Sequence, residues 1–354
     1  MLYVNARFFS QEVTGVQRFA IELSQKLCEQ RDDVVFLAPA KIKHNEVTKH
    51  LNVKVIGKNS GHFWEQYDLP SYLRDIDNPL LVNFCNTAPL FYKNKVITLH
   101  DVAYKRFPQS YSFKFRGAYN FIIPRLIASS RAVLTVSQFA KSELEHFFNL
   151  PKEHCYVVYN AASDLFHPQM QAKENHAPEK YFLAVASQQY HKNFEGLIAA
   201  FACLPECLGF KLKIVGAQHK NYQGVESILA SSTSINHVEF LGRVDDDTLS
   251  ELYRRAFAFV FPSFYEGFGI PPLEAQASGC PVIASSAAAM PEVLQDSVIY
   301  FDPYDRNSLV NALKSSIENQ SGRHRFVEAG YKNAARFSWE SSASCLNSII
   351  NALS

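Results

Sequence analysis

The chain has 354 residues, of which 47% are hydrophobic and 19% are charged, and its formal net charge is +1. A chain of this length is expected to form about two domains, each large enough for its own core, and the composition is that of an ordinary globular protein. The near-zero net charge excludes a global attraction to nucleic acid, so any site for a polyanion must be local.

The N-terminal segment and the cysteines favour a cytoplasmic protein. MLYVNARFFSQEVTG lacks the basic stretch and apolar run of a secretory signal, and no later apolar stretch reaches the roughly 18 residues that a membrane helix needs. The seven cysteines are odd in number and scattered, which predicts free thiols. Cys203 and Cys207 form the nearest pair and lack the further ligands of a zinc site.

Short apolar segments predict strands that are buried on both faces of parallel sheets. In chain order they are residues 34–39, 95–100, 132–137, 156–160, 181–187, 211–216, 237–242, 257–263 and 281–285. Between them, residues 14–30 and 193–204 carry apolar side chains at helical spacing on one face. This alternation predicts an α/β protein with crossover connections.

The composition changes at PQMQAKENHAPEK, residues 168–180, where a polar stretch bracketed by prolines separates two sets of strands. We therefore expect an N-terminal domain over residues 1–168 and a C-terminal domain over residues 169–337. Each is predicted to be a doubly wound sheet, which binds ligands beyond the carboxyl ends of its strands.

One such position is FPSFYEGFGIPPLEAQASG, residues 261–279, which holds Glu266 and Glu274. The double proline fits the first turn of a helix, where its missing N–H groups need no partner. Glu274 is then expected in that first turn, and Glu266 in the loop before it, where glycines let backbone N–H groups approach a ligand. By themselves the two carboxylates are also explained as complements to the helix dipole, an effect of about 0.3–1 kcal/mol.

The whole stretch, with its continuation SGCPVIASSAAAMPEVLQDSVIYFDPYD, resembles the Glu-x7-Glu signature of glycosyltransferase family 4, retaining enzymes of the GT-B fold. The resemblance implies two doubly wound, Rossmann-like domains facing each other across a cleft. It also implies that a C-terminal helix, at about residues 338–354, crosses back onto the first domain. Glu266 is then expected to contact the sugar of a nucleotide-sugar donor, and Glu274 its ribose. The resemblance further implies that four backbone amides face the sugar and diphosphate. They are the amides of Gly267, Phe268, Gly269 and Ile270.

FLAVASQQYHKNFEGLIAAF resembles the family's phosphate-binding segment and places Lys192 at its lysine. An anion shared with the helix N-terminus would make a cation favourable there. Without the resemblance, Lys192 by itself is explained as an exposed lysine on a loop. Many family members carry an arginine where this chain has Ser187, which shifts the expected phosphate clamp toward Lys192 and backbone amides.

Two segments of the N-terminal half also match the family. VITLHDVAY matches a His-Asp segment, which implies that His100 lies against the donor sugar in the catalytic centre. The alternative is a histidine that is bonded to local backbone. EVTGVQRFAIEL resembles a glycine loop in which Gly15 approaches the diphosphate, although Thr14 and Gln17 also form a capping box.

VEFLGRVDDDTLSELYRRA matches the segment that lines the base pocket and makes Arg243 a candidate nucleotide contact. The aspartates at 245–247 raise the question of a metal, because acidic clusters bind divalent cations in the other main glycosyltransferase fold. Here they precede a helical pattern, so capping is the predicted role. GT-B enzymes do not need a bound metal, and we expect neither a metal nor another cofactor.

The resemblance implies a hexosyltransferase. Lys192, a helix N-terminus and the amide of Gly15 would stabilise the departing nucleoside diphosphate, while Glu266 and His100 position the sugar. The pattern resembles bacterial mannosyltransferases that assemble lipopolysaccharide, O-antigen or capsule. GDP-mannose is therefore the first donor to test and a UDP-sugar the second, with a saccharide or lipid-linked glycan as acceptor. A noncatalytic nucleotide-sugar-binding protein and a GT-B epimerase are the alternatives.

Residues 110–131, SYSFKFRGAYNFIIPRLIASSR, mix aromatic side chains with Lys114, Arg116, Arg125 and Arg131. One interpretation is a peripheral contact with the inner face of the cytoplasmic membrane, where a lipid-linked acceptor would be found. The other is a solvated helix face. No nucleic-acid partner is expected.

Overall fold

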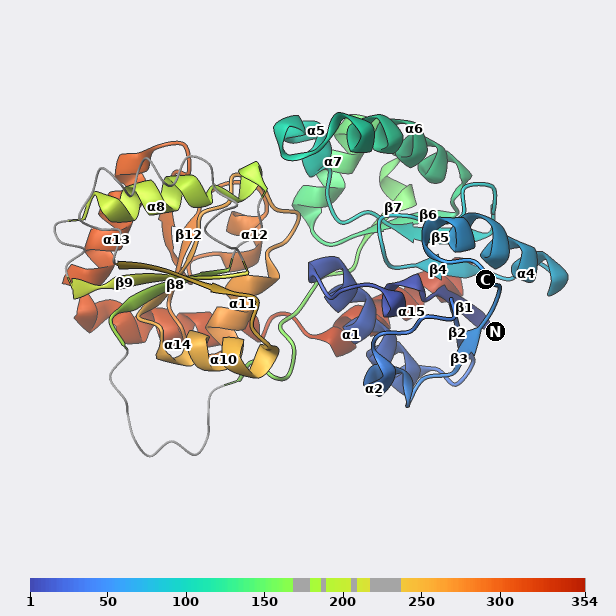
Figure 1. The fold of residues 1–354 in the computed structure, drawn as a ribbon, viewed down its shortest axis with the longest axis horizontal. Coiled ribbons are helices and arrows are strands. Elements are labelled where there is room, and N and C mark those ends of the chain that lie inside the picture. The colour runs from blue at the N-terminus through green and yellow to red at the C-terminus, as the bar shows by residue number, and fades with distance from the viewer. Residues whose placement is uncertain (168–178, 186–188, 205–208, 217–236, 354) are drawn as a thin grey trace. The chain divides into compact units, whose positions relative to one another are not determined.

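The computed structural model describes residues 1–167, 179–185, 189–204, 209–216 and 237–353, and they form two compact units, each built on a parallel sheet (Figure 1). The first unit contains Met1–Val102, Ser112–Asn160 and Ser338–Ser354, and the second contains Ala103–Tyr111 and Ala161–Phe337. No helix of the described residues is long and apolar enough to cross a bilayer.

The first unit has a seven-stranded parallel sheet in the order β3-β2-β1-β4-β5-β6-β7. Its strands are β1 (Leu2–Asn5), β2 (Val34–Ala38), β3 (Val53–Val55), β4 (Leu81–Asn83), β5 (Lys95–Thr98), β6 (Ala132–Thr135) and β7 (Cys155–Val157). The central strands are buried on both faces, which is why they consist of nearly continuous apolar runs.

Helices cover both faces of this sheet. They are η1 (Arg7–Ser10), α1 (Gly15–Gln30), α2 (Asn45–Thr48), α3 (Gly61–Phe63), η2 (Trp64–Asp68), α4 (Leu69–Asp75), α6 (Phe113–Ser129), α7 (Gln138–Phe148), η4 (Lys152–His154) and α15 (Trp339–Leu353). Although α15 is the last helix of the chain, it packs beside α1, with the rings of Phe19 and Trp339 6.0 Å apart. Ser342 Oγ donates to the carbonyl oxygen of Tyr159 at 2.7 Å and ties the helix to the end of the sheet.

The second unit has a six-stranded parallel sheet in the order β10-β9-β8-β11-β12-β13. The strands are β8 (Tyr181–Val185), β9 (Lys211–Val215), β10 (Val238–Gly242), β11 (Ala258–Phe261), β12 (Val282–Ser285) and β13 (Ile299–Phe301). The helices are α5 (Ala103–Arg106), η3 (Pro108–Ser110), η5 (Tyr190–Lys192), α8 (Phe194–Ala202), α10 (Asp246–Arg255), α11 (Ile270–Ala277), α12 (Met290–Leu294), α13 (Arg306–Glu318), η9 (Gln320–Gly322) and α14 (Arg323–Ala334).

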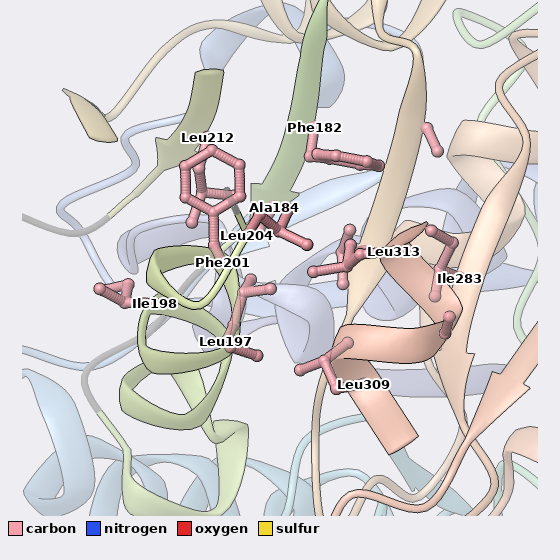
Figure 2. Packing of buried hydrophobic residues seen from close by; sticks show 14 of the residues in the cluster. Phe182, Ala184, Leu197, Ile198, Phe201, Leu204, Leu212, Ile283, Leu309 and Leu313 are labelled. Atoms are coloured by element: carbon pink, nitrogen blue, oxygen red, sulfur yellow. The ribbon is translucent and has the colours of Figure 1, made fainter. Parts of the chain in front are cut away.

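Within the second unit, α8 and α13 lie over one face of the sheet, and α10, α11 and α14 over the other (Figure 1). The core on the α8 side is apolar and aromatic. Figure 2 shows Leu197 of α8 near Leu309 of α13, and the rings of Phe201 of α8 and Phe182 of β8 lie 6.4 Å apart. This packing fixes β8 at the centre of the sheet.

The α/β architecture with doubly wound sheets is confirmed, and all nine predicted strands are present. Strands β1, β3, β4 and β13 were not predicted; each is short, and β3 is largely exposed. The division of the chain differs from the predicted boundary at residue 168. The chain passes from the first unit to the second after Asn160, and the earlier segment Ala103–Tyr111 also belongs to the second unit. Residues 168–178 lie outside the described part of the chain.

Candidate functional site

Strands β8 and β11 are neighbours at the centre of the second sheet, where the strand order reverses. Doubly wound sheets bind ligands beyond the carboxyl ends of the strands at this switch point. The loops that leave these two ends carry Lys192 and Glu266, and Lys192 Nζ donates to Glu266 Oε1 at 2.6 Å. Ser263 Oγ donates to the same oxygen at 2.8 Å. The side chains of Lys192 and Glu266 are 22% and 13% exposed, so the pair is largely desolvated yet still reachable.

Hydrogen bonds to backbone carbonyls connect the two loops beside this ion pair. Asn193 has a left-handed conformation, with φ 55°, at the start of α8. Its side-chain amide donates to the carbonyl oxygens of Pro262 at 3.1 Å and Pro303 at 3.3 Å. The N–H of Phe264 donates to the carbonyl of His191 at 2.8 Å. The loops after β8 and β11 therefore form one connected edge.

Helix α11 begins at this edge, directly after Gly269. Gly269 has φ 93°, and a Cβ atom there would lie 2.7 Å from Met290 Cε. The side chains of Phe268 and Ile270 are buried, so only the backbone at these positions can contact a ligand. The double proline contributes no N–H groups to the first turn. Donors for an anion must therefore come from the amides between Gly267 and Ile270.

Glu274 lies in α11 beyond the first turn, which corrects its predicted placement, because the helix already begins at Ile270. It is 5% exposed, and the hydroxyl of Tyr253 on α10 donates to its Oε2 at 3.3 Å. Glu266 instead contacts Lys192 and Ser263. The two glutamates thus occupy different polar environments, and a buried carboxylate requires such partners.

His100 belongs to the first unit and follows β5. It is 7% exposed, and its Nε2 lies 2.8 Å from the carbonyl oxygen of Phe84, so Nε2 carries the proton. Its backbone N–H donates to Asn86 Oδ1 at 2.9 Å. Burial lowers the pKa of His100 to about 4, so the imidazole is neutral near pH 7. Its backbone contacts match the structural alternative, and its role toward a sugar stays a prediction.

Gly15 is the first residue of α1, and the predicted capping box is present, with the N–H of Thr14 donating to Gln17 Oε1 at 3.2 Å. Apart from its chain neighbours and its own helix backbone, no heavy atom of the described residues lies within 4 Å of a Cβ placed on Gly15. Arg243 is exposed, and Ser187 lies outside the described residues. The contacts of Gly15 and Arg243 with a donor stay predictions.

Asp245 caps α10, as predicted, and accepts a hydrogen bond from the N–H of Thr248 at 2.8 Å. Hydrogen bonds from the side chain and then from the backbone N–H of Thr248 lower the pKa of Asp245. In the described ranges, no group of three or more His, Cys, Asp or Glu side chains is placed to hold a metal ion. The cysteines among these residues are free.

The structure brings Lys192 and Glu266 into direct contact, and it adds two residues that the sequence did not single out. Ser263 and Tyr253 hold the two glutamates, one each. Ser263 stands three residues before Glu266 at the end of a predicted strand, so its position was a usable signal. Tyr253 faces Glu274 from another helix, and no local sequence pattern predicts that contact.

Both halves of the chain match glycosyltransferase family models. Residues 13–163 match the model described as Glycosyltransferase Family 4, and residues 167–333 match Glycosyl transferases group 1. O-antigen chain mannosyltransferase B of Escherichia coli is 27% identical over 374 residues, which cover 96% of this chain and 96% of that protein. O-antigen chain mannosyltransferase RfbU of Salmonella typhimurium is 33% identical over 230 residues, which cover 65% of this chain and 62% of that protein.

Solved structures show the same fold. Anabaena HepE, in complex with UDP and glucose, superposes with a TM-score of 0.78 at 18% identity, over 99% of each chain. At this identity the similarity establishes the architecture alone. The chain has two doubly wound sheets, and an ion pair lies at the switch point of the second. Family models match both halves of the chain, and these observations lead to one conclusion. The chain belongs to glycosyltransferase family 4 and is a glycosyltransferase of the GT-B fold.

Proposed function

We propose that the second unit binds a nucleotide-sugar donor at the carboxyl ends of β8 and β11, and that the chain transfers its hexose with retention of configuration. The observation that carries this proposal is the contact between Lys192 and Glu266 at the switch point of the sheet. A cation and a carboxylate held together there offer one group for the diphosphate and one for sugar hydroxyls.

During transfer, the bond between the sugar's anomeric carbon and the diphosphate oxygen breaks, and the departing diphosphate gains negative charge. The ammonium of Lys192 has three donors, so it contacts a phosphate oxygen while it keeps Glu266 as a partner. The amides before α11 add further donors. The acceptor oxygen attacks the same face of the sugar, and its proton passes to the departing phosphate oxygen.

His100 and Glu274 take supporting roles in this proposal. A neutral His100 with its proton on Nε2 presents Nδ1 as an acceptor for a sugar hydroxyl. Glu274 binds the ribose hydroxyls. Gly15 and Arg243 approach the diphosphate and the base. The proposed reaction requires no metal ion or other cofactor, because positive charge and backbone dipoles balance the leaving group.

We propose GDP-mannose as the first donor and a saccharide or lipid-linked glycan as the acceptor, in the assembly of lipopolysaccharide O-antigen or capsule in the cytoplasm. The relatives named O-antigen chain mannosyltransferases support this choice. A UDP-sugar is the second donor, since HepE was solved with UDP and glucose.

The test is turnover of a panel of UDP- and GDP-sugars with an extract of lipid-linked acceptors. A hydrogen bond to a charged group contributes about 1.5–3 kcal/mol, or roughly 10- to 150-fold. Glu266→Ala is expected to slow transfer by this factor with nearly unchanged affinity for the nucleoside diphosphate. Glu274→Ala is expected mainly to weaken that affinity. The exposed Glu318 provides the matched control, Glu318→Ala. No donor turnover by the unmodified chain, or equal losses of affinity in both variants, would contradict the proposal.

We further propose that α6 rests on an anionic membrane surface. Phe113, Gly117, Phe121, Pro124 and Ala128 are all exposed on α6. At about 100° per residue they fall within roughly 80° of the helix circumference and form one apolar stripe. Phe113 and Phe121 are 80% and 54% exposed.

Cations flank the apolar stripe. The guanidinium of Arg125 lies 3.5 Å from the ring centre of Phe121, and that of Arg116 lies 5.8 Å from Phe113. The sequence between Asp101 and Glu143 contains no acidic residue, whereas it carries Lys105, Arg106, Lys114, Arg116, Arg125, Arg131 and Lys141. Exposed aromatic side chains in a cationic stretch of sequence without acidic residues fit a bilayer that contains anionic lipids.

Sedimentation with phosphatidylglycerol and phosphatidylcholine vesicles tests this surface. We expect salt-sensitive binding to the anionic vesicles and its loss in Phe113→Ser/Phe121→Ser. Phe63 and Tyr67, 59% and 61% exposed and stacked 4.5 Å apart, supply the control pair Phe63→Ser/Tyr67→Ser. Equal loss in both double variants, or equal binding to both lipids, would contradict the proposal.

A further inference from the structure

Residues Ala103–Tyr111 belong to the second unit, although the residues on both sides of them belong to the first. This segment contains α5 and η3, and η3 contacts η5, the turn that ends at Lys192. Its contacts concentrate on the residues that neighbour Lys192 and Glu266.

His191 is the centre of these contacts. Ser110 Oγ lies 3.2 Å from the backbone nitrogen of His191 and 3.0 Å from its Nδ1. Since the hydroxyl accepts the backbone N–H, its own proton can be donated to Nδ1 of a neutral imidazole. Tyr111 stacks on the imidazole at 6.0 Å with 12° between planes, and Phe107 lies 6.2 Å away on a tilted plane. The histidine is 3% exposed.

The environment of His191 keeps it neutral. Burial lowers its pKa to about 4, and the adjacent charge of Lys192 acts in the same direction, while Glu266 acts against them. A neutral ring is the form that accepts the Ser110 proton. The hydrogen bond and the protonation state therefore support each other.

The segment also contacts the loop that carries Glu266. Phe107 stacks on Phe264 at 6.0 Å with 10° between planes and lies 6.0 Å from Tyr265. The N–H of Phe264 donates to the carbonyl of His191, so both loops converge on one residue. Ser110 thus contacts the residue before Lys192, and Phe107 contacts the two residues before Glu266.

We propose that Ser110 is a positioning residue that acts through His191 to hold Lys192 toward a bound diphosphate. It touches neither reacting atom. Its hydroxyl fixes the backbone and the ring of the residue before Lys192, so the ammonium is presented in one geometry. This inference rests on the proposed function, in which Lys192 binds the diphosphate of the donor.

The test is a double-mutant cycle on the full chain, with the affinity for UDP and for GDP measured by calorimetry. Ser110→Ala should weaken the binding of the nucleoside diphosphate by about 3- to 10-fold, the range expected for one hydrogen bond. In a Lys192→Ala background the same change should have no further effect, because the residue through which Ser110 acts is gone. Ser110→Thr keeps the hydroxyl and should retain the affinity.

Ser142→Ala is the matched control, since Ser142 is an exposed serine on α7 whose hydroxyl donates to the carbonyl oxygen of Phe139 in the same helix. An affinity loss in Ser110→Ala no larger than in this control, or one that persists in full without Lys192, would overturn the inference alone. No binding of UDP or GDP by the unmodified chain would instead contradict the proposed function and remove the inference with it.

Discussion

Substitutions at the two ends of α11 are expected to have similar effects on stability and different effects on ligand affinity. Gly269 precedes the helix with φ 93°, and Gly279 follows it with φ 80°. A Cβ atom on Gly269 would lie 2.7 Å from Met290 Cε, and one on Gly279 would lie 2.3 Å from the hydroxyl of Tyr331. An alanine at either position is therefore strained and meets the end of a side chain.

The expected destabilisation is similar for Gly269→Ala and Gly279→Ala. A left-handed conformation costs an L-residue about 1–2 kcal/mol, and crowding of a packed neighbour adds about 1–3 kcal/mol. A loss of roughly 2–5 kcal/mol would lower the melting temperature of a unit of this size by roughly 4–20 °C, measurable by calorimetry. Both variants should show it.

Their affinities for a nucleoside diphosphate should differ. Gly269 lies among the amides proposed to face the diphosphate, so its displacement should weaken binding by about 10- to 150-fold, the contribution of one charge-assisted hydrogen bond. Gly279 lies at the opposite end of the helix, and its variant should bind within about threefold of the unmodified chain. Equal losses of affinity, or an unchanged melting temperature in Gly269→Ala, would refute the reasoning.

Three further predictions concern buried polar groups. Ser263→Ala removes a donor from Glu266 and should slow transfer about tenfold at saturating donor without changing nucleotide affinity; an unchanged rate would contradict it. Burial lowers the pKa of Lys95 from 10.5 to about 8. Between pH 8 and pH 10.5, Lys95 therefore carries a proton in the unfolded chain but not in the folded chain. The unfolding free energy should therefore rise with pH across that window relative to Lys95→Met, by at most about 3 kcal/mol in urea titrations; parallel curves would contradict it. The pKa of His100, lowered from 6.5 to about 4, predicts stability that is lost as pH falls through this range, and an NMR titration of the imidazole near 6.5 would disagree.

The fold was largely predictable because its central strands are buried on both faces. Such strands must be apolar throughout, and the helices between them must be amphipathic, so the alternation is visible in the sequence. Strand β3 escaped prediction because it is short and exposed at the sheet edge, where burial imposes no pattern. The place of Ala103–Tyr111 in the second unit depends on aromatic contacts with residues far away in the chain, which periodicity does not record.

Local stretches of the candidate site stand out in the sequence, whereas most contacts between distant residues do not. Glu266, the glycines and the double proline lie in one stretch whose order itself is informative. The capping roles of Thr14 and Asp245 likewise follow from neighbouring residues. In contrast, Ser110 and His191 stand 81 residues apart, and neither residue type indicates the other. Hydrogen bonds across such separations are set by the topology of the sheets.

The position of α15 has a consequence for the synthesis of the chain. The face of α1 that carries Phe19 packs against α15, which is translated long after the strands of the first unit. About 180 residues separate the end of β7 from α15. At roughly 5–20 residues per second, the first unit leaves the ribosome with this apolar face uncovered for on the order of 10–40 s. Nascent chains stalled before Trp339 should therefore be clients for a chaperone that binds exposed aromatic helices, and release should coincide with the emergence of α15.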